Sequence, residues 1–242
     1  MKALEVKDKL MEYIMAYLGP KGFKYKRVNN TEFKIVRKRE NGNLDRIVGG
    51  IDNYNPRYKI QLGNGMTHKI IIDILYQVNE KISLGAVLQK DMSTFSFKPN
   101  NEYYGNKDNI FNWHEPFTTE EGLREQVDKV IEYLENGGMA AFDKYQDLRE
   151  VDKIFNNLDN MWDPIHSRIG YSLGGYDYLT RIIIAKLSGN PNYEKIVQWS
   201  FEWIEREYKV AKYPDSWVQT KLETETLVEI LKDIQPLYDS YE

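Results

Sequence analysis

The sequence predicts an α+β protein in which an N-terminal helix and an antiparallel β-meander are followed by a C-terminal helical bundle. Apolar residues near the N-terminus recur at helical spacing and then alternate with polar residues as far as about residue 98. From residue 118 onward the helical spacing returns. We therefore expect a helix-plus-sheet region over residues 1–112 and a helical region over residues 113–242, either as two domains or packed as one unit.

The first helix is predicted from apolar residues that lie three and four positions apart. These residues are Ala3, Val6, Leu10, Ile14 and Leu18. Gly19-Pro20 is expected to end the helix, because proline lacks the amide N–H that continues the helical hydrogen-bond ladder.

Short strands are expected after this helix. Rings and cations alternate over residues 23–26, as in a strand with one buried face. Asn41-Gly42 is a dipeptide preferred in tight β-hairpins, and Gly49-Gly50 indicates a β-bulge or a bend. Gly63-Asn64-Gly65 is expected to turn the chain between two strands.

The sequence pattern at the end of the meander allows two assignments. Residues 68–78, HKIIIDILYQV, are rich enough in β-branched side chains for a strand, and a short helix is the alternative. Residues 84–89 and the TFSF segment at residues 94–97 complete a meander of five to seven strands.

The helical region begins at Thr118-Thr119-Glu120-Glu121. This segment fits a capping box in which Thr118 is the N-cap and Glu121 reaches back to it. Asn136-Gly137-Gly138 indicates the end of that first helix. Further helices are expected over residues 139–158, 176–187, 193–208 and 218–234.

The composition excludes several kinds of site. The chain has no cysteine, which excludes disulfides, thiolate nucleophiles and cysteine-ligated metal centres. The first eighteen positions are interrupted by Glu5, Lys7, Asp8, Lys9 and Glu12, so the start does not resemble a secretory signal, and the apolar runs are too short to span a membrane. We expect a cytoplasmic protein with no membrane partner and no cofactor.

Charge is distributed unevenly along the chain. Residues 1–110 contain 19 Lys and Arg against 12 Asp and Glu, a net charge of +7, whereas residues 111–242 contain 14 against 25, a net charge of −11. This asymmetry predicts either an ionic seam between the two regions or charged surfaces for partners.

Two histidines lie close to carboxylates in the sequence. His114 precedes Glu115 in the FNWHEPF segment, and His166 follows Asp163. A ligand site or acid–base site between sheet and helices would use the residues Tyr103, Tyr104, Trp113, His114, Asp163 and His166. The alternative for the same segment is a joint between the two regions, in which Trp113 anchors the connection against the core.

Serine catalysis and nucleotide binding receive less support. Gly170-Tyr171-Ser172-Leu173-Gly174 matches the GxSxG pattern, but the preceding residues are largely polar and no histidine follows Ser172 in the chain. Gly63-Asn64-Gly65 has His68 where the third glycine of a dinucleotide-binding loop would stand.

Nucleic-acid binding would depend on the basic and aromatic segment over residues 23–39. Strand alternation argues against it, because the rings and the lysines of this segment are expected to lie on opposite faces. The acidic second region would also repel a long polyanion.

Protein binding would depend on the helices. Residues 181–205 are typical of a helical hairpin, and Trp199, Phe201 and Trp203 are spaced two apart, so one narrow helix face cannot bury all three. These rings either pack within the fold or form part of an acidic, aromatic surface that suits a basic protein partner.

Residues 4–98 resemble certain uncharacterised bacterial domain families. The residues that carry the resemblance are LGPKGFKYKR after the first helix, FKIVRKR in a hairpin and ISLGAVLQK in a later strand. Some members of these families are suspected immunity proteins encoded near toxins, and no catalytic residues are established for them. The resemblance implies an α+β protein that binds another protein.

The sequence therefore leaves three functional hypotheses, of which nucleic-acid binding through the basic segment over residues 23–39 is the third. The first is a non-enzymatic protein-binding protein, immunity-like or adaptor-like, with a basic protein as its partner. The second is an enzyme or a small-ligand-binding protein with a site near His114 and His166.

Overall fold

The computed structural model describes residues 2–84, 88, 90, 92–97, 115–157, 169–170, 177–212 and 214–241. The chain divides into two compact units. Unit 1 comprises Met1–Thr67 and Phe95–Lys144, and unit 2 comprises His68–Thr94 and Tyr145–Glu242. Both units contain residues from each side of residue 112, and whether either side folds alone stays a prediction.

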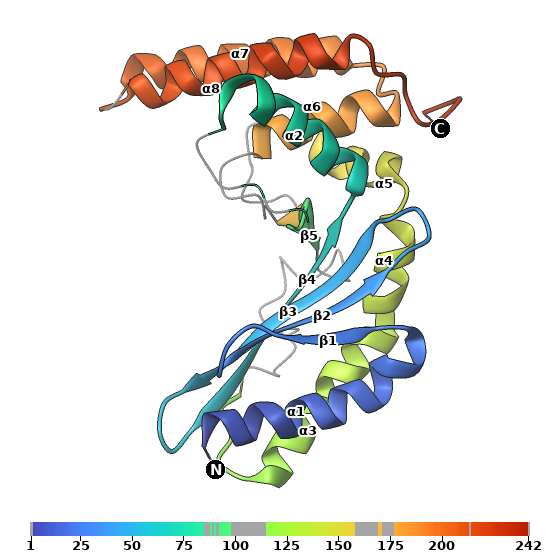
Figure 1. Cartoon of the computed structure of the whole chain (residues 1–242), viewed down its shortest axis with the longest axis vertical. Coiled ribbons are helices and arrows are strands. Elements are labelled where there is room, and N and C mark those ends of the chain that lie inside the picture. Colours follow the sequence, from blue (N-terminus) through green and yellow to red (C-terminus); the bar gives the residue numbers. More distant parts are fainter. Residues whose placement is uncertain are drawn as a thin grey trace. The chain divides into compact units, whose positions relative to one another are not determined.

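The sheet of unit 1 confirms the predicted antiparallel meander. Its strands are β1 (Lys24–Arg27), β2 (Glu32–Lys38), β3 (Leu44–Asn53), β4 (Tyr58–Thr67) and β5 (Phe95–Phe97). Each of the first four strands pairs antiparallel with the next, and β5 pairs with the end of β4 (Figure 1).

One face of this sheet is covered by helices. The helical segments of unit 1 are α1 (Ala3–Leu18), η1 (Gly19–Lys21), α3 (Glu120–Tyr133), η4 (Leu134–Gly138) and α4 (Met139–Lys144). Helices α1 and α3 pack together beside the strands (Figure 1). Buried Phe33, Ile35 and Ile47 point to the covered face, and the Asn64 side-chain amide donates a buried hydrogen bond of 2.8 Å to the Tyr133 hydroxyl. The alternating residues of the same strands therefore form the other face.

A buried ion cluster fastens one end of the sheet to α4. Asp45 is fully buried and accepts hydrogen bonds from Arg37 Nε at 2.6 Å and from Arg39 Nε at 2.7 Å. Arg39 Nη2 also donates to Asp143 of α4 at 2.6 Å. Burial raises the pKa of Asp45, against the opposing effect of the two guanidinium groups.

Unit 2 is mainly helical, as predicted for the C-terminal part. Its helices are α2 (Lys69–Ile82), α5 (Leu148–Phe155), α6 (Asp177–Ser188), α7 (Tyr193–Val210) and α8 (Asp215–Leu231), with a short strand β6 (Ile169–Gly170). Helices α7 and α8 lie side by side, and α2 and α6 pack against α8 (Figure 1).

The C-terminal residues of unit 2 are fastened to α5 and α6. The Leu237 amide donates to the Leu187 carbonyl at 2.8 Å, and the Leu148 amide donates to the Tyr238 hydroxyl at 2.8 Å. The Tyr241 hydroxyl donates to the buried Asp152 carboxylate at 2.7 Å. Asp152 also accepts hydrogen bonds from the amides of Asn156 and Asn190, so its buried charge is well solvated by protein groups.

The structure corrects two expectations about the strands. Residues 68–78 lie mostly in α2, because Ile71, Leu75 and Val78 are buried at helical spacing and their packing overrides the β preference of the isoleucines. Gly49-Gly50 forms no bulge, since β3 and β4 keep an unbroken register through both residues. The predicted strand over residues 84–89 lies largely outside the described residues.

The positions of the turns also differ from those predicted. Gly63-Asn64-Gly65 lies inside β4, and the chain reverses instead over residues 54–57. The Asn41-Gly42 hairpin is confirmed, although only Gly42 has a positive φ, of 85°. This fits a three-residue loop closed by glycine rather than a two-residue turn.

Two helix boundaries also differ. The N-cap of α3 is Thr119 rather than Thr118, because the Thr119 hydroxyl accepts from the Gly122 amide at 3.1 Å. The single helix expected over residues 139–158 is divided into α4 and α5, and Asp147 caps α5 by accepting from the Arg149 amide. Among the helices that the structure describes, none is long and apolar enough to cross a membrane.

Candidate functional site

The ligand-site residues predicted from the sequence lie outside the described residues. These are Tyr103, Tyr104, Trp113, His114, Asp163 and His166, and Ser172 lies outside them as well. The small-ligand hypothesis therefore stays a prediction.

Residues 115–117, which follow His114 in the sequence, are attached to β4 of the sheet. Phe117 and Tyr58 exchange two backbone hydrogen bonds, of 2.8 and 2.9 Å, and their rings lie 6.1 Å apart. Glu115 pairs with Lys129 of α3 at 3.2 Å. This segment joins the start of α3 to β4, and Phe117 is the anchoring residue among those described.

His68 is the one histidine within the described residues, and its surroundings are structural. Its side chain is 2% exposed, and Nε2 lies 2.9 Å from the Tyr145 carbonyl. Burial lowers the pKa of His68 to about 4, so the ring is neutral and donates to that carbonyl. No group of three or more His, Asp or Glu side chains in the described parts of the chain could hold a metal ion.

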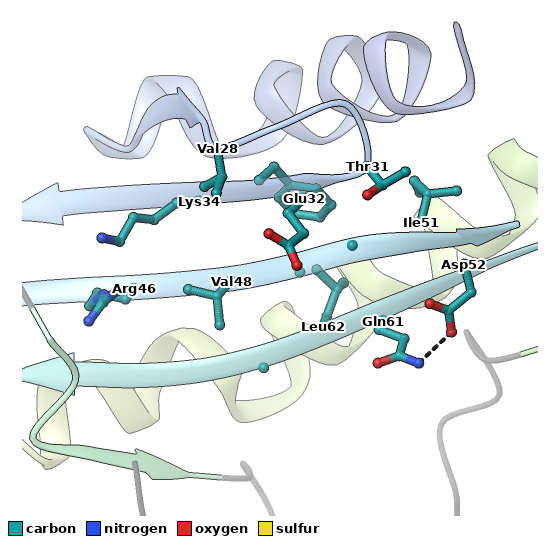
Figure 2. A pocket seen from close by; sticks show the side chains of 14 residues that line it. Val28, Thr31, Glu32, Lys34, Arg46, Val48, Ile51, Asp52, Gln61 and Leu62 are labelled. Carbon is teal, nitrogen blue, oxygen red and sulfur yellow. Dashed lines mark hydrogen bonds between the residues drawn. The ribbon is translucent and has the colours of Figure 1, made fainter. Parts of the chain in front are cut away.

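A groove of unit 1 lies on the sheet face that α1 and α3 do not cover. It has a volume of about 630 Å³, and β2, β3, β4 and the β1–β2 turn line it (Figure 2). We call it the sheet groove.

Glycines hollow the sheet groove. The register places Gly63 beside Val48 and Lys34 in one row across the strands, and Gly50 between Glu32 and Gln61 in another. Because two of these positions have no side chain, the residues around them stand above bare backbone.

The charges of the sheet groove are segregated. Lys34 and Arg46 lie at one end, and Asp52 lies at the other, where it accepts a hydrogen bond from Gln61 (Figure 2). Glu32 lies between them on β2 (Figure 2). Lys26 of the neighbouring strand β1 faces Lys34 across the register and extends the cationic end.

The aromatic residues of the basic hairpin point away from the groove. Tyr25 pairs with Ile35, and Arg27 pairs with Phe33, whereas Lys24 and Lys26 occupy the alternate positions of β1. Phe33 is buried on the covered face, with 1% of its side chain exposed. The expected separation of rings and lysines onto opposite faces is confirmed.

A second charged surface of unit 1 lies along α3 and the first residues of η4. It consists of five exposed carboxylates three or four residues apart, which we call the acidic stripe: Glu121, Glu125, Asp128, Glu132 and Glu135. The opposite side of the helix carries Leu123, Val127 and Val130, which are buried. The stripe therefore faces solvent along the whole helix.

Among the described residues, the cations of α3 pair with carboxylates outside the acidic stripe. The two basic residues of α3 are engaged elsewhere, Arg124 with Glu120 at 3.5 Å and Lys129 with Glu115 at 3.2 Å. No ion pair joins any of the five carboxylates to another described residue.

In unit 2 the tryptophan-rich segment packs within the fold. The ring centroids of Trp203 and Trp217 lie 5.0 Å apart in an edge-to-face arrangement, and those of Trp203 and Tyr178 lie 6.2 Å apart. Trp199 and Phe201 are also half-buried. A smaller groove of about 350 Å³ lies between the end of α7 and the start of α8, beside exposed Tyr208 and Val218.

Neither the acidic stripe nor the sheet groove of unit 1 was predicted from the sequence. The acidic stripe could have been found from its three- and four-residue spacing once the capped helix at residue 120 was predicted. The sheet groove could not, because it depends on which residues face each other across three strands.

Comparisons of the chain with protein-family models, with curated proteins and with solved structures found no match.

Proposed function

We propose that this is a non-enzymatic protein-binding protein, immunity-like or adaptor-like, and that a basic surface of its partner docks along the acidic stripe of α3. The supporting observation is that five exposed carboxylates lie along one side of α3 and the start of η4, and that no ion pair among the described residues involves any of them. Complementary charge on a partner would steer its approach and fix the register of the complex.

The arrangement is costly for the isolated protein, which supports a binding role. Like charges three or four residues apart on a helix destabilise it by about 0.2–0.5 kcal/mol per pair. Glu132, in the last turn of α3, also meets the negative end of the helix dipole, and no basic residue offsets it there. A basic partner would remove both costs on binding.

The experiment is a comparison of matched charge variants in affinity purification from the source cells. The stripe variant carries Glu121→Gln, Glu125→Gln, Asp128→Asn and Glu132→Gln. The control variant removes the same charge from exposed positions in unit 2, with the substitutions Glu194→Gln, Glu202→Gln, Glu225→Gln and Asp233→Asn.

We expect one stoichiometric partner, with a basic contact surface, to be retained by the wild type and the control variant and lost by the stripe variant. At about 0.2–1 kcal/mol for each exposed ion pair, loss of four pairs weakens binding by roughly fourfold to nearly a thousandfold. A partner held equally by all three proteins would refute docking on α3.

A further inference from the structure

We propose that the groove between α7 and α8 is where a second copy of this chain docks, so that the protein associates with itself through unit 2. The groove lies between the end of α7 and the start of α8, and its lining includes Tyr208, Trp217 and Val218. We call it the helix groove. The acidic stripe belongs to unit 1, so this inference is independent of the function proposed for α3.

Large apolar side chains are exposed around the helix groove. Tyr208 near the end of α7 is 48% exposed, and Val218 and Leu222 near the start of α8 are 56% and 44% exposed. Val210, the last residue of α7, is 74% exposed. Exposed apolar side chains that gather in one place indicate an interaction surface, whereas single scattered ones need no explanation.

The packing of α8 leaves two of these side chains on its outer side. Val218 lies nine residues before Leu227, and Leu222 lies nine residues before Leu231. Nine residues are about two and a half turns of α-helix, so the members of each pair point to opposite sides of α8. This end of the α7–α8 pair also extends beyond α2 and α6 (Figure 1). Because Leu227 and Leu231 are buried, Val218 and Leu222 form an outward apolar ridge, which we call the outer ridge.

The helix groove and the outer ridge have shapes that suit each other. A surface that binds a copy of itself has to provide both a hollow and a projection, because a two-fold axis brings the same surface to both sides. The groove has a volume of about 350 Å³, and Val218 belongs both to its wall and to the ridge. The ridge of one copy can therefore enter the groove of the other, while its own groove receives the other ridge.

The charges around the groove are also self-complementary. Glu205, Lys209 and Lys221 line the groove, and Glu225 lies one turn beyond Lys221 on α8. No ion pair among the described residues involves any of these four side chains. A second copy supplies a carboxylate for each lysine and a lysine for each carboxylate, whereas a uniformly basic or acidic partner would pair only one sign of charge.

Sedimentation velocity of the full chain over a range of concentrations measures the self-association. Val218→Glu and Leu222→Glu each place a carboxylate on the outer ridge, at exposed helical positions where glutamate is a good helix former. Val28→Glu makes the same change in unit 1 at a valine of nearly equal exposure, 57%, and is the control. Circular dichroism of each variant checks that the helices are intact.

A pair of charge variants tests whether the occupant is a second copy. The acidic variant carries Lys209→Glu and Lys221→Glu, and the basic variant carries Glu205→Lys and Glu225→Lys. Each variant alone brings like charges together across the two-fold axis, whereas a mixture of the two brings opposite charges together. Association of the mixture therefore requires that this surface contacts its own counterpart.

We expect the wild type and Val28→Glu to dimerise with dissociation constants on the order of micromolar, because a groove of this size makes a small interface. Val218→Glu and Leu222→Glu should each raise the dissociation constant at least roughly tenfold. The acidic and basic variants should be monomeric when separate and dimeric when mixed. A wild type that stays monomeric, a dimer that the ridge variants leave unchanged, or charge variants that do not associate when mixed would overturn the proposal.

Discussion

At the scale of single residues, Gly49 keeps the covered face of the sheet packed. A Cβ at this position would lie 2.7 Å from both Leu62 Cδ2 and Phe33 Cζ, and it would also meet the Gln61 backbone oxygen. The two side chains fill the space that the glycine leaves, so the absence of a side chain at Gly49 is a packing requirement.

Gly49→Ala is therefore expected to destabilise unit 1 by on the order of 1–3 kcal/mol, because Phe33 and the β4 backbone have to move. Gly63→Ala is the matched control, and we expect it to be neutral or slightly stabilising because its Cβ has room. Urea unfolding of both variants measures the difference. Equal loss of stability in the two variants would contradict this account of the covered face.

His68 gives unit 2 a dependence on pH. The pKa of the folded state, about 4, lies below the ordinary value of 6.5, so the unfolded chain binds the proton more readily between these values. The stability that the neutral ring contributes is present above about pH 6.5 and is lost as the pH falls toward 4.

We expect the free energy of unfolding of the wild type, relative to His68→Gln, to fall by about 3 kcal/mol between neutral pH and pH 4. Denaturant unfolding of both proteins across this range measures it, and His114 and His166 cancel because both proteins retain them. A constant difference across the range would mean that the ring is not buried in its neutral form.

At the scale of elements, α3 combines a stabilising contact with a destabilising surface. Glu120, which is not part of the acidic stripe, accepts hydrogen bonds from Lys9 and Tyr13 of α1. The hydrogen bond from Lys9 is the main cause that lowers the pKa of Glu120 to about 2. None of the five stripe carboxylates forms an ion pair with another described residue, and they repel one another.

We expect the double variant Glu125→Gln, Asp128→Asn to be more stable than the wild type by roughly 1 kcal/mol, because three like-charge pairs along the stripe disappear. Glu120→Gln is the control, and it should lower stability because it breaks the contact between α1 and α3. Thermal unfolding at low ionic strength shows both effects. If the double variant were less stable, the argument that the stripe is retained for binding would lose its basis.

The secondary-structure elements also show which parts of the fold can be predicted from sequence patterns. The helices were predictable because each buries an apolar face at a period of 3.6, and this signal extends over several turns. Residues 68–78 were misassigned because isoleucines suit both a strand and a buried helix face. Gly63-Asn64-Gly65 was misassigned because glycine is common in turns but also occurs inside strands, where it leaves a gap in the row of side chains.

At the scale of the whole molecule, the two units take their residues from alternating parts of the chain. The switch from strand to helix patterns near residue 112 indicates a change of secondary structure, and tertiary packing alone assigns α3 and α4 to the unit that contains the sheet. A sequence read from one end to the other carries no local signal for this assignment, because it depends on contacts between residues far apart in the chain.

The charge asymmetry has a more specific interpretation at this scale. Residues 1–110 are basic and residues 111–242 are acidic, yet unit 1 contains both the cationic end of the sheet groove and the acidic stripe. The charge of a surface in this protein therefore does not follow from the net charge of the half of the chain that supplies it.

The most direct test of the proposed function is isothermal titration of the purified partner into the wild type, the four-site stripe variant and the four-site unit 2 control. We predict similar dissociation constants for the wild type and the control. The dissociation constant for the stripe variant should be higher by roughly fourfold to nearly a thousandfold, and this difference should shrink as salt is added. An unchanged dissociation constant for the stripe variant at low salt would contradict docking on α3.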